Sequence, residues 1–528
     1  MRQAAIAAAM LTLSAIAACG SSPPQIISYS PERGTIDVST AAPIRIAFDH
    51  DVDKESVAIR LSMLPATNGT VVWLGPRQLE YQHSTLQPST LYEVVLEAGY
   101  KDVAGNAYAL RHHWSFNTER APSVAGSTPA NLEGDVDPAS YVSIDFTREM
   151  DVAALKSAIT IEPSVPFSVR LDPADAKRAV VVPDSLLDPS TSYSVDVSTA
   201  ALDAHGNQLL RDQSFVFHTG LARPLRHWVA FATAFADGSS GGVWIVNESG
   251  FPRQLFDGPA VQSFSWSPEG TSLLIHTNGT WSVFTPGVTS VSLPFKAGWA
   301  APLAAGRGYV YIDAIGTLHR WSADGADEVI ATNVSQAATA PGGLRVAYVQ
   351  PGLSSSTVWG YDVGLRSRYE LSAEPAAVRD LSWAPAGNRI AYLRQDAQAI
   401  TLRVRNLTGQ AATTTIASGD IGHATWLPDS THLVFAASIA AASGAVRKAF
   451  LVNVIAPPAV LTAALAIPST SALDVTNPVP SPDGHQIAFV SSDQVWMMNA
   501  DGTRPTALTR FDSESFPYSC RMPAWTRL

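Results

Sequence analysis

Cysteine is nearly absent from this chain: only Cys19 and Cys520 occur among 528 residues. A disulfide-stabilised scaffold is therefore excluded, because such scaffolds need several cysteine pairs. Apolar packing must hold every domain together. Cys520 lies in an apolar segment near the C-terminus, and we expect it to serve as a small packed residue rather than as a nucleophile or redox group.

Charge is also scarce. Charged residues make up 15% of the chain, the formal net charge is −11, and no run of lysine or arginine occurs. Nucleic acid binding needs a clustered basic surface, so this function class is excluded. Long helical periodicity is absent, whereas 36 prolines and 35 glycines are typical of a turn-rich all-β protein. The length predicts about three domains.

The longest apolar run lies at the N-terminus, from Ala4 to Ala18, and follows Arg2. It is too short to span a membrane and is typical of a secretory signal. The phrase Ile16-Ala17-Ala18-Cys19 resembles the bacterial lipobox. This resemblance implies a lipoprotein signal peptide at 1–18, a lipid anchor on Cys19 and a polar tether at 19–24. An ordinary signal peptide with an incidental cysteine is the alternative.

The N-terminal half contains an internal repeat, because residues 25–118 align with residues 121–219. Each unit has the size, short alternating strands and regular turn signals of an immunoglobulin-like sandwich. The pattern resembles the bacterial Ig-like domain of surface-layer and secreted proteins. The Pro-x-Thr-x-Tyr phrases imply a tyrosine corner, in which the hydroxyls of Tyr92 and Tyr193 reach back to the backbone. Short proline-containing linkers follow the two units, at 119–123 and 220–225.

A second repeat occupies the C-terminal half. Apolar strands end at Trp266, Trp383 and Trp426, and each is followed by a Pro-containing turn and another apolar strand. Pro480-Ser481-Pro482-Asp483-Gly484 has the same pattern, and weaker copies lie near residues 300 and 339. In such a turn proline presets φ, Asp483 bonds its own backbone and Gly484 accepts positive φ. A period of roughly 35–55 residues with short strands predicts β-propeller blades.

The last copy, Arg521–Trp525, has a strand pattern but no blade of its own. Residues 227–256 supply three strands and lack the inner one. We therefore predict that the C-terminal strand pairs with this segment and closes the ring, which leaves no open edge. This arrangement gives seven blades, with six or eight as alternatives. The repeat resembles the TolB-like, or WD40-like, propeller family over residues 225–528, a resemblance that implies the fold and says little about activity.

Three local motifs suggest chemistry, and each also has a structural interpretation that we favour. Gly238-Ser239-Ser240-Gly241-Gly242 matches a nucleophile elbow, yet it falls in a predicted hairpin rather than a strand-to-helix turn. Residues 49–53 resemble the start of a calcium loop without its glycine or distal glutamate. His112 and His113 are adjacent in a strand, so they point to opposite faces.

The sequence thus predicts an all-β fold of two tandem Ig-like β-sandwiches, 25–118 and 121–219, followed by a propeller, 225–528. We expect no catalytic residue, cofactor or metal. The predicted function is a non-catalytic, lipid-anchored protein of the cell envelope, on the extracytoplasmic side, whose propeller binds an envelope protein or a glycan. The alternative is a polysaccharide hydrolase or lyase with its active site at the channel mouth. Candidate members of that site are Asp313, His319, Asp362, Asp420 and His423.

Overall fold

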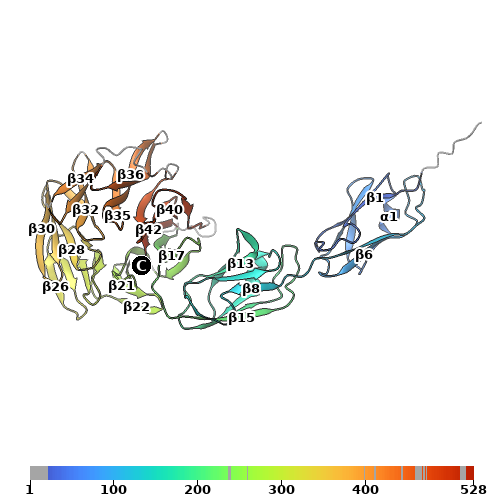
Figure 1. The fold of residues 1–528 in the computed structure, drawn as a ribbon, viewed down its shortest axis with the longest axis horizontal. Coiled ribbons are helices and arrows are strands. Elements are labelled where there is room, and N and C mark those ends of the chain that lie inside the picture. The colour runs from blue at the N-terminus through green and yellow to red at the C-terminus, as the bar shows by residue number, and fades with distance from the viewer. Residues whose placement is uncertain are drawn as a thin grey trace, which may run out of the picture.

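The computed structural model describes residues 22–235, 240–258, 260–397, 399–409, 412–441, 444–457, 467, 470, 473–511 and 519–527. The predicted leader, Cys19 and residues Gly238 and Ser239 lie outside this set. Within it the chain is all-β except for two short helices. Three bodies follow one another in a row (Figure 1), with the sandwich that contains β1 at one end and the sheets that contain β16–β42 at the other. No described helix is long and apolar enough to cross a membrane.

The first sandwich packs a sheet of order β1-β2-β5-β4 on a sheet of order β3-β6-β7. Alternate residues of the strands point inward; Ile44, Ile46 and Phe48, for example, are buried. They join one hydrophobic cluster with Trp114 and Phe116 from the opposite sheet. The elements are β1 (Ile26–Ser30), β2 (Ile44–Phe48), α1 (Lys54–Ala58), β3 (Leu61–Leu64), β4 (Gly69–Trp73), β5 (Gln78–His83), β6 (Leu91–Leu96) and β7 (His112–Asn117).

The second sandwich repeats this design, with sheets of order β12-β13-β10-β8 and β11-β14-β15-β9. Val142, Ile144 and Phe146 of β10 are buried in its core. The elements are β8 (Val124–Thr128), β9 (Glu133–Val136), β10 (Val142–Phe146), α2 (Val152–Ala158), β11 (Ile159–Glu162), β12 (Phe167–Asp172), β13 (Asp175–Pro183), β14 (Ser192–Val197) and β15 (Gln213–Thr219).

Both predicted tyrosine corners are present. The hydroxyl of Tyr92 accepts a hydrogen bond from the backbone N–H of Gln87 at 3.0 Å, and that of Tyr193 accepts one from Asp188 at 2.9 Å. Both tyrosines are buried. The internal alignment made from the sequence is therefore correct at the level of individual hydrogen bonds.

Residues 229–525 form seven separate antiparallel sheets among the described residues, which we call the seven-sheet domain. Five described sheets besides the first run as meanders of four strands, and the sixth has three described strands. Sheets one to three contain β16 (Val229–Ala234), β17 (Ser240–Val246), β18 (Arg253–Phe256); β19 (Val261–Trp266), β20 (Leu273–Thr277), β21 (Thr280–Thr285), β22 (Val288–Ser292); and β23 (Trp299–Pro302), β24 (Tyr309–Ile312), β25 (Leu318–Trp321), β26 (Asp327–Ala331).

The remaining sheets continue the same order along the chain. Sheets four to seven contain β27 (Gln336–Thr339), β28 (Arg345–Pro351), β29 (Ser356–Asp362), β30 (Ser367–Glu374); β31 (Ala377–Trp383), β32 (Arg389–Gln395), β33 (Ile400–Asn406), β34 (Thr413–Ser418); β35 (Ile421–Trp426), β36 (His432–Ala441), β37 (Gly444–Asn453); and β38 (Thr476–Pro480), β39 (Gln486–Ser491), β40 (Gln494–Asn499), β41 (Thr506–Ala507), with β42 (Ser519–Trp525) returning to sheet one.

The predicted turn chemistry recurs after the first strand of each sheet from the second to the seventh. In the seventh, Ser481 N–H donates to Gln486 C=O at 2.8 Å and Gly484 N–H donates to Ser481 C=O at 2.9 Å. Gly484 has φ of 75°, the left-handed conformation that glycine adopts without steric cost. In the sixth sheet Ser430 takes this position with φ of 57°. We call these six turns the tetrad turns.

The first sheet is completed from the other end of the chain. β42 pairs antiparallel with β16, so the sheet has the order β18-β17-β16-β42. The pairing predicted for the C-terminal strand is therefore confirmed. One hydrophobic cluster joins this sheet to the seventh, because Phe231, Cys520 and Trp525 pack with Ala488 and Val495.

Candidate functional site

One end of the seven-sheet domain carries all the tetrad turns. Successive strands of a meander run in opposite directions, so the turn after the first strand and the turn after the third strand lie at the same end of each sheet. We call this end the tetrad face. It is built from the tetrad turns and from the loops that follow β17, β21, β25, β29, β33, β37 and β40.

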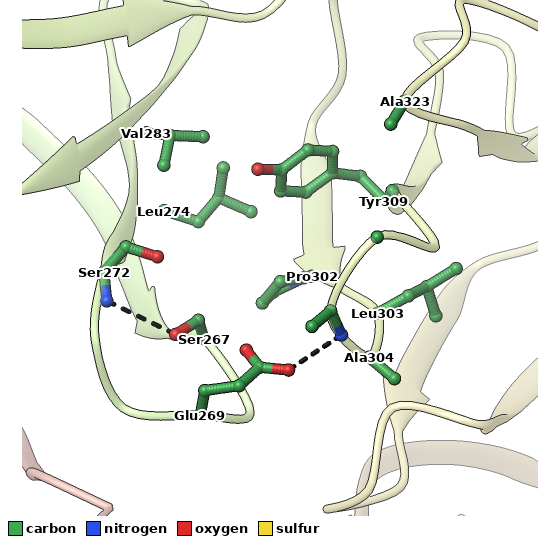
Figure 2. Close-up of a pocket in the computed structure, with 13 residues that line it drawn as sticks. Ser267, Glu269, Ser272, Leu274, Val283, Pro302, Leu303, Ala304, Tyr309 and Ala323 are labelled. Carbon is green, nitrogen blue, oxygen red and sulfur yellow. Dashed lines mark hydrogen bonds between the residues drawn. The ribbon is translucent and has the colours of Figure 1, made fainter.

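A small pocket of about 180 Å³ opens on the tetrad face between the second and third sheets. Glu269, from the tetrad turn of the second sheet, accepts a hydrogen bond from Ala305 N–H at 2.7 Å across this seam. Tyr309 projects its ring toward Leu274 and Val283 on the other wall (Figure 2). Burial raises the pKa of the Tyr309 phenol, and the Glu269 carboxylate adds to the effect. The pocket is therefore a small seam between two sheets that the Glu269–Ala305 hydrogen bond ties together.

A larger polar pocket of about 380 Å³ lies on the tetrad face between the seventh and first sheets. His227 and Asp483 approach each other there at 3.8 Å, and His485 and Asn499 also line it. Burial disfavours the charged form of Asp483, but hydrogen bonds from the Ser481 hydroxyl and the His485 N–H outweigh it and lower the pKa. Asp483 is thus an anion already engaged in its turn, as the sequence pattern indicated.

Arg527 links distant parts of the tetrad face. It follows β42 of the first sheet, and its guanidinium donates to the carbonyl of Pro341, in the tetrad turn of the fourth sheet, at 3.3 Å. Surrounding protein atoms lower its pKa, and the Glu269 carboxylate partly offsets this. A cation therefore lies between sheets one, two and four.

The first strands of neighbouring sheets carry polar side chains at one repeat position. Asp380 and His423 each lie three residues before the tryptophan of their strand. Asp380 forms an ion pair with Arg379 and has a positive φ of 58°. The surrounding protein lowers the pKa of His423, while the Asp380 charge raises it by a smaller amount. The strands β31 and β35 both have an irregular register around these residues, and such irregularities change the direction in which side chains point.

Only one pair among the residues that the sequence offered for an enzyme is in contact within the described part of the chain. Asp313 and His319 approach at 3.3 Å within the third sheet. Asp362 accepts the N–H groups of its own turn, and Asp420 accepts the Ser438 hydroxyl at 2.6 Å. His423 lies on β35 as described above. Each acid has a local structural partner.

The segment that resembles a calcium loop, residues 49–53, forms a turn and the N-terminal cap of a helix. Asp53 caps α1 by accepting the N–H groups of Glu55 and Ser56. Asp51 pairs with Arg77 at 2.7 Å, and Asp49 accepts the Gln25 N–H at 2.8 Å. All three carboxylates therefore have protein partners, which agrees with the structural interpretation.

The histidine pair and the nucleophile-elbow match also fit their structural interpretations where the structure describes them. His112 packs on Tyr29 and Trp114, whereas His113 pairs with Glu93 at 2.7 Å. Ser240–Val246 is strand β17, which forms a hairpin with β16. No strand-to-helix turn exists at that described part of the motif.

A cluster that the sequence analysis missed lies between the two sandwiches. Glu119, from the linker, lies 2.8 Å from His205 Nδ1 and accepts a hydrogen bond from the side-chain amide of Asn207 at 2.9 Å. The Glu119 side chain is 1% exposed. Arg148 contacts both Glu119 and Asp203. Glu119, Asp203 and His205 have ligand atoms close enough for a metal ion, but the Arg148 guanidinium already supplies the cation. We call this group the clasp, and it joins the first sandwich to the second.

Comparison of the internal repeats offers a signal for the clasp. Gly220 follows the second sandwich at the position where Glu119 follows the first, and His50 occupies the position of Arg148. The charge pair thus occurs only at the junction where one sandwich follows another. The role of these two residues becomes visible only from contacts between the domains, so the sequence alone did not reveal the clasp.

Comparison with known families supports the N-terminal assignment. The model of the bacterial Ig-like domain family matches residues 20–118 and residues 119–219. The N-terminal part of the chain therefore consists of two bacterial Ig-like domains. The repeats read from the sequence, 25–118 and 121–219, lie within these two matched ranges. Among curated protein sequences, none matches the chain significantly.

Solved structures similar to this chain include two TolB proteins and a lyase. TolB from Acinetobacter baumannii has 11% sequence identity and a TM-score of 0.37, with coverage of 70% of this chain and 83% of its own. A TolB from Agrobacterium tumefaciens has 15% identity and a TM-score of 0.35, covering 53% and 88%. An oligogalacturonate lyase in complex with manganese has 12% identity and a TM-score of 0.39, covering 54% and 85%. At these TM-scores the similarities carry no argument about activity.

Proposed function

We propose that this chain is a lipid-anchored binding protein of the cell envelope. In this proposal Cys19 carries the lipid, the two Ig-like domains form a stalk, and the seven-sheet domain is a closed propeller of seven blades that presents its tetrad face to a partner. The arrangement of the bodies in a row carries the proposal: the sandwich that contains β1 lies farthest from the seven-sheet domain (Figure 1). An anchor at that end would hold the propeller away from the membrane.

Ring closure is supported by contacts that repeat around the domain. Hydrophobic clusters join each sheet to the next, for example the fifth to the sixth and the sixth to the seventh. The cluster that contains Trp525 joins the seventh to the first. A closed ring has no open sheet edge at the first and last blades, which removes a site of aggregation.

Rigidity of the stalk is supported by the clasp. Its hydrogen bonds connect Thr40 of the first sandwich to Asn207 of the second at 2.6 Å, in addition to the contacts of Glu119. Glu119 lies in the segment that the sequence alone suggested to be a simple linker. A fixed junction lets two domains act as one spacer instead of as a flexible chain.

The tetrad face offers apolar groups for a macromolecular partner. Leu365, Leu344 and Ile455 lie in its loops and turns and are exposed by 78%, 48% and 65%. Exposed large apolar side chains beside polar pockets are typical of protein interaction surfaces. Of the three candidate acids only Asp362 lies on this face, and it accepts the N–H groups of its own turn, so binding accounts for this face better than acid–base catalysis does.

An affinity capture experiment tests the proposal. The purified chain serves as bait in an envelope extract, alongside Leu365→Glu on the tetrad face and Leu132→Glu on the second sandwich, where Leu132 is 80% exposed. We expect the tetrad-face variant to lose the captured partner and the control to retain it. Loss with the control alone would assign binding to the stalk and overturn the proposal.

A further inference from the structure

A cavity of about 550 Å³ lies where the second sandwich meets the first sheet of the seven-sheet domain. We propose that this cavity is a binding site for a neutral saccharide. Its volume is within the range of pockets that take small ligands, about 300–1,000 Å³, and such pockets concentrate at domain interfaces. Residues of the second sandwich line most of it, and the rest of the lining comes from Trp228, which directly precedes the seven-sheet domain, and from Asn247 within it. The cavity includes Asn247 from the loop after β17, at one edge of the tetrad face, whereas the partner-binding residues proposed above, Leu365, Leu344 and Ile455, belong to the fourth and sixth sheets.

The two walls of the cavity are held in place by direct contacts. Gln254 N–H donates to Asp184 C=O at 2.7 Å, and a parallel bridge joins Ser185 to Gln254. Tyr141 packs edge-on against Phe251, with ring centroids 5.4 Å apart. These contacts join the second sandwich to β18 and to the loop before it. The cavity is therefore formed before any ligand arrives, which lowers the entropic cost of binding.

Aromatic rings come from both walls. Tyr141 lies just before β10 and is 39% exposed, whereas Trp228 lies just before β16 and exposes 8% of its surface. Rings that combine an apolar body with a polar tip suit ligands that are apolar on one side and hydroxylated on the other. The C–H faces of a sugar ring, surrounded by hydroxyl groups, have this character.

Polar groups of the wall are free to bind hydroxyls. Among the described residues, the side-chain hydroxyls of Thr128, Ser140 and Tyr141 have no protein hydrogen-bond partner. Glu133 and Asp137 each use one carboxylate oxygen to accept a backbone N–H, from Ala130 and Ala139. Their second oxygens remain as acceptors. Hydroxyl groups that donate and accept, beside carboxylates that only accept, match a polyhydroxylated ligand.

Charges around the cavity are largely balanced, which favours a neutral ligand over a cation. Asp135 pairs with Arg223 at 2.6 Å, and Arg178 pairs with Asp145 at 2.6 Å. Behind Asp137 lies Arg253, which is 1% exposed. Burial lowers the pKa of Arg253 to about 10, with Asp137 acting in the opposite direction, so it remains a cation at neutral pH.

The internal repeat separates this site from the framework of the Ig-like domain. At the positions of Tyr141, Glu133 and Asp137 the first sandwich has Pro43, Thr35 and Ser39. Both sandwiches form the same kind of core and the same tyrosine corner, although only the second sandwich has the aromatic and acidic side chains at these positions. The aromatic and acidic side chains are therefore not needed for the fold, and they occur only on the sandwich that faces the seven-sheet domain.

Calorimetric titration of the purified chain tests the proposal with three probes: cellotetraose, tetra-N-acetylchitotetraose and trilysine. We expect a tetrasaccharide to bind. Tyr141→Ala should weaken binding tenfold or more, and Tyr141→Phe, which keeps the ring packed on Phe251, by about two- to tenfold through the lost hydroxyl. Tyr369→Ala is the control, because Tyr369 on β30 is similarly exposed, at 36%, and lies outside the cavity lining.

Three outcomes would overturn the saccharide site: no tetrasaccharide binding, binding of trilysine alone, or equal saccharide affinity in Tyr141→Phe, Tyr141→Ala and the parent chain. Should Tyr141→Ala fail to fold, the comparison of Tyr141→Phe with the parent chain decides. Partner capture by the tetrad face is measured separately with the Leu365→Glu variant. A failure of one site therefore remains distinguishable from a failure of the other.

Discussion

The indole N–H of Trp525 donates to the carbonyl of Val479 at 2.9 Å. Trp383 makes the same bond to Ala338 at 3.1 Å, and Trp426 makes it to Ser382 at 3.0 Å. In the latter two cases the acceptor belongs to the preceding sheet in the chain. For Trp525, in the first sheet, the acceptor belongs to the seventh. The contact that joins neighbouring sheets elsewhere therefore also joins the first sheet to the last.

Loss of the Trp525 contact should destabilise the seven-sheet domain. Trp525→Phe removes one hydrogen bond, and we expect it to cost about 0.5–1.5 kcal/mol of unfolding free energy. Trp525→Ala also leaves a cavity beside Phe231 and should cost about 3–5 kcal/mol. Denaturant unfolding measures both, with Trp383→Phe as the matched variant. A Trp525→Ala chain with unchanged stability would show that β42 does not hold the first sheet to the seventh.

Cys520 should report the opening of β42. It is buried, and burial raises the pKa of its thiol to about 12, with a hydrogen bond from Thr509 partly opposing the shift. The thiolate is the reactive form, so iodoacetamide at pH 8 should label the folded chain very slowly and the unfolded chain readily. Trp525→Ala should accelerate labelling of the folded chain. Rapid labelling of the unaltered folded chain would contradict the packing of this strand.

The clasp should weaken when Glu119 loses its charge. Hydrogen bonds and the Arg148 charge outweigh burial, so the pKa of Glu119 lies below its usual value. A lowered pKa in the folded state means that this contribution is complete above about pH 4.3 and declines as the pH falls below it. Glu119→Gln should cost about 1–3 kcal/mol at pH 7 and less at pH 3.

Hydrogen exchange at a clasp amide gives the clearest measurement of this effect. The Thr40 N–H donates to Glu119 at 3.1 Å, so its exchange at pH 7 should accelerate in Glu119→Gln. Glu149→Gln, on the neighbouring exposed turn, is the matched control and should leave the amide protected. Equal protection in both variants would show that the sandwiches are held together by other contacts.

Membrane association should depend on Cys19. Acyl chains supply most of the free energy of lipid anchoring, so Cys19→Ala should move the chain from the membrane fraction to the soluble fraction. Metabolic labelling with a radioactive fatty acid should also disappear. A Cys19→Ala chain that still sediments with membranes and incorporates label would refute the lipid anchor.

Local patterns in the sequence predicted most of the fold. Apolar strands that end at Trp266, Trp383 and Trp426 are followed by turns whose hydrogen bonds depend only on residues five apart or closer. The tyrosine corners at Tyr92 and Tyr193 are equally local. Pairing of β42 with β16 was predicted because each segment lacked the strand that the other supplied. Such features follow from repeat phase and turn chemistry.

The clasp and the interdomain cavity could not be predicted in the same way. Glu119 contacts His205, which lies 86 residues away in the sequence, and Tyr141 contacts Phe251 because two different domains dock against each other. Neither contact has a periodic pattern, and a lone glutamate in a linker has the composition of any solvated linker. The geometry of domain docking decides which of these side chains become buried, and that geometry is not encoded by a local motif.

Photo-cross-linking in intact cells tests most directly the central claim, that the tetrad face binds an envelope partner at the end of a stalk. A photoreactive residue replaces Leu365 on the tetrad face, Leu353 in the loop between β28 and β29 at the opposite end of the same sheet, or Leu132 on the second sandwich; all three side chains are exposed. The account predicts a discrete cross-linked product from position 365 and none from positions 353 or 132. A product from either control position, with none from 365, would contradict it.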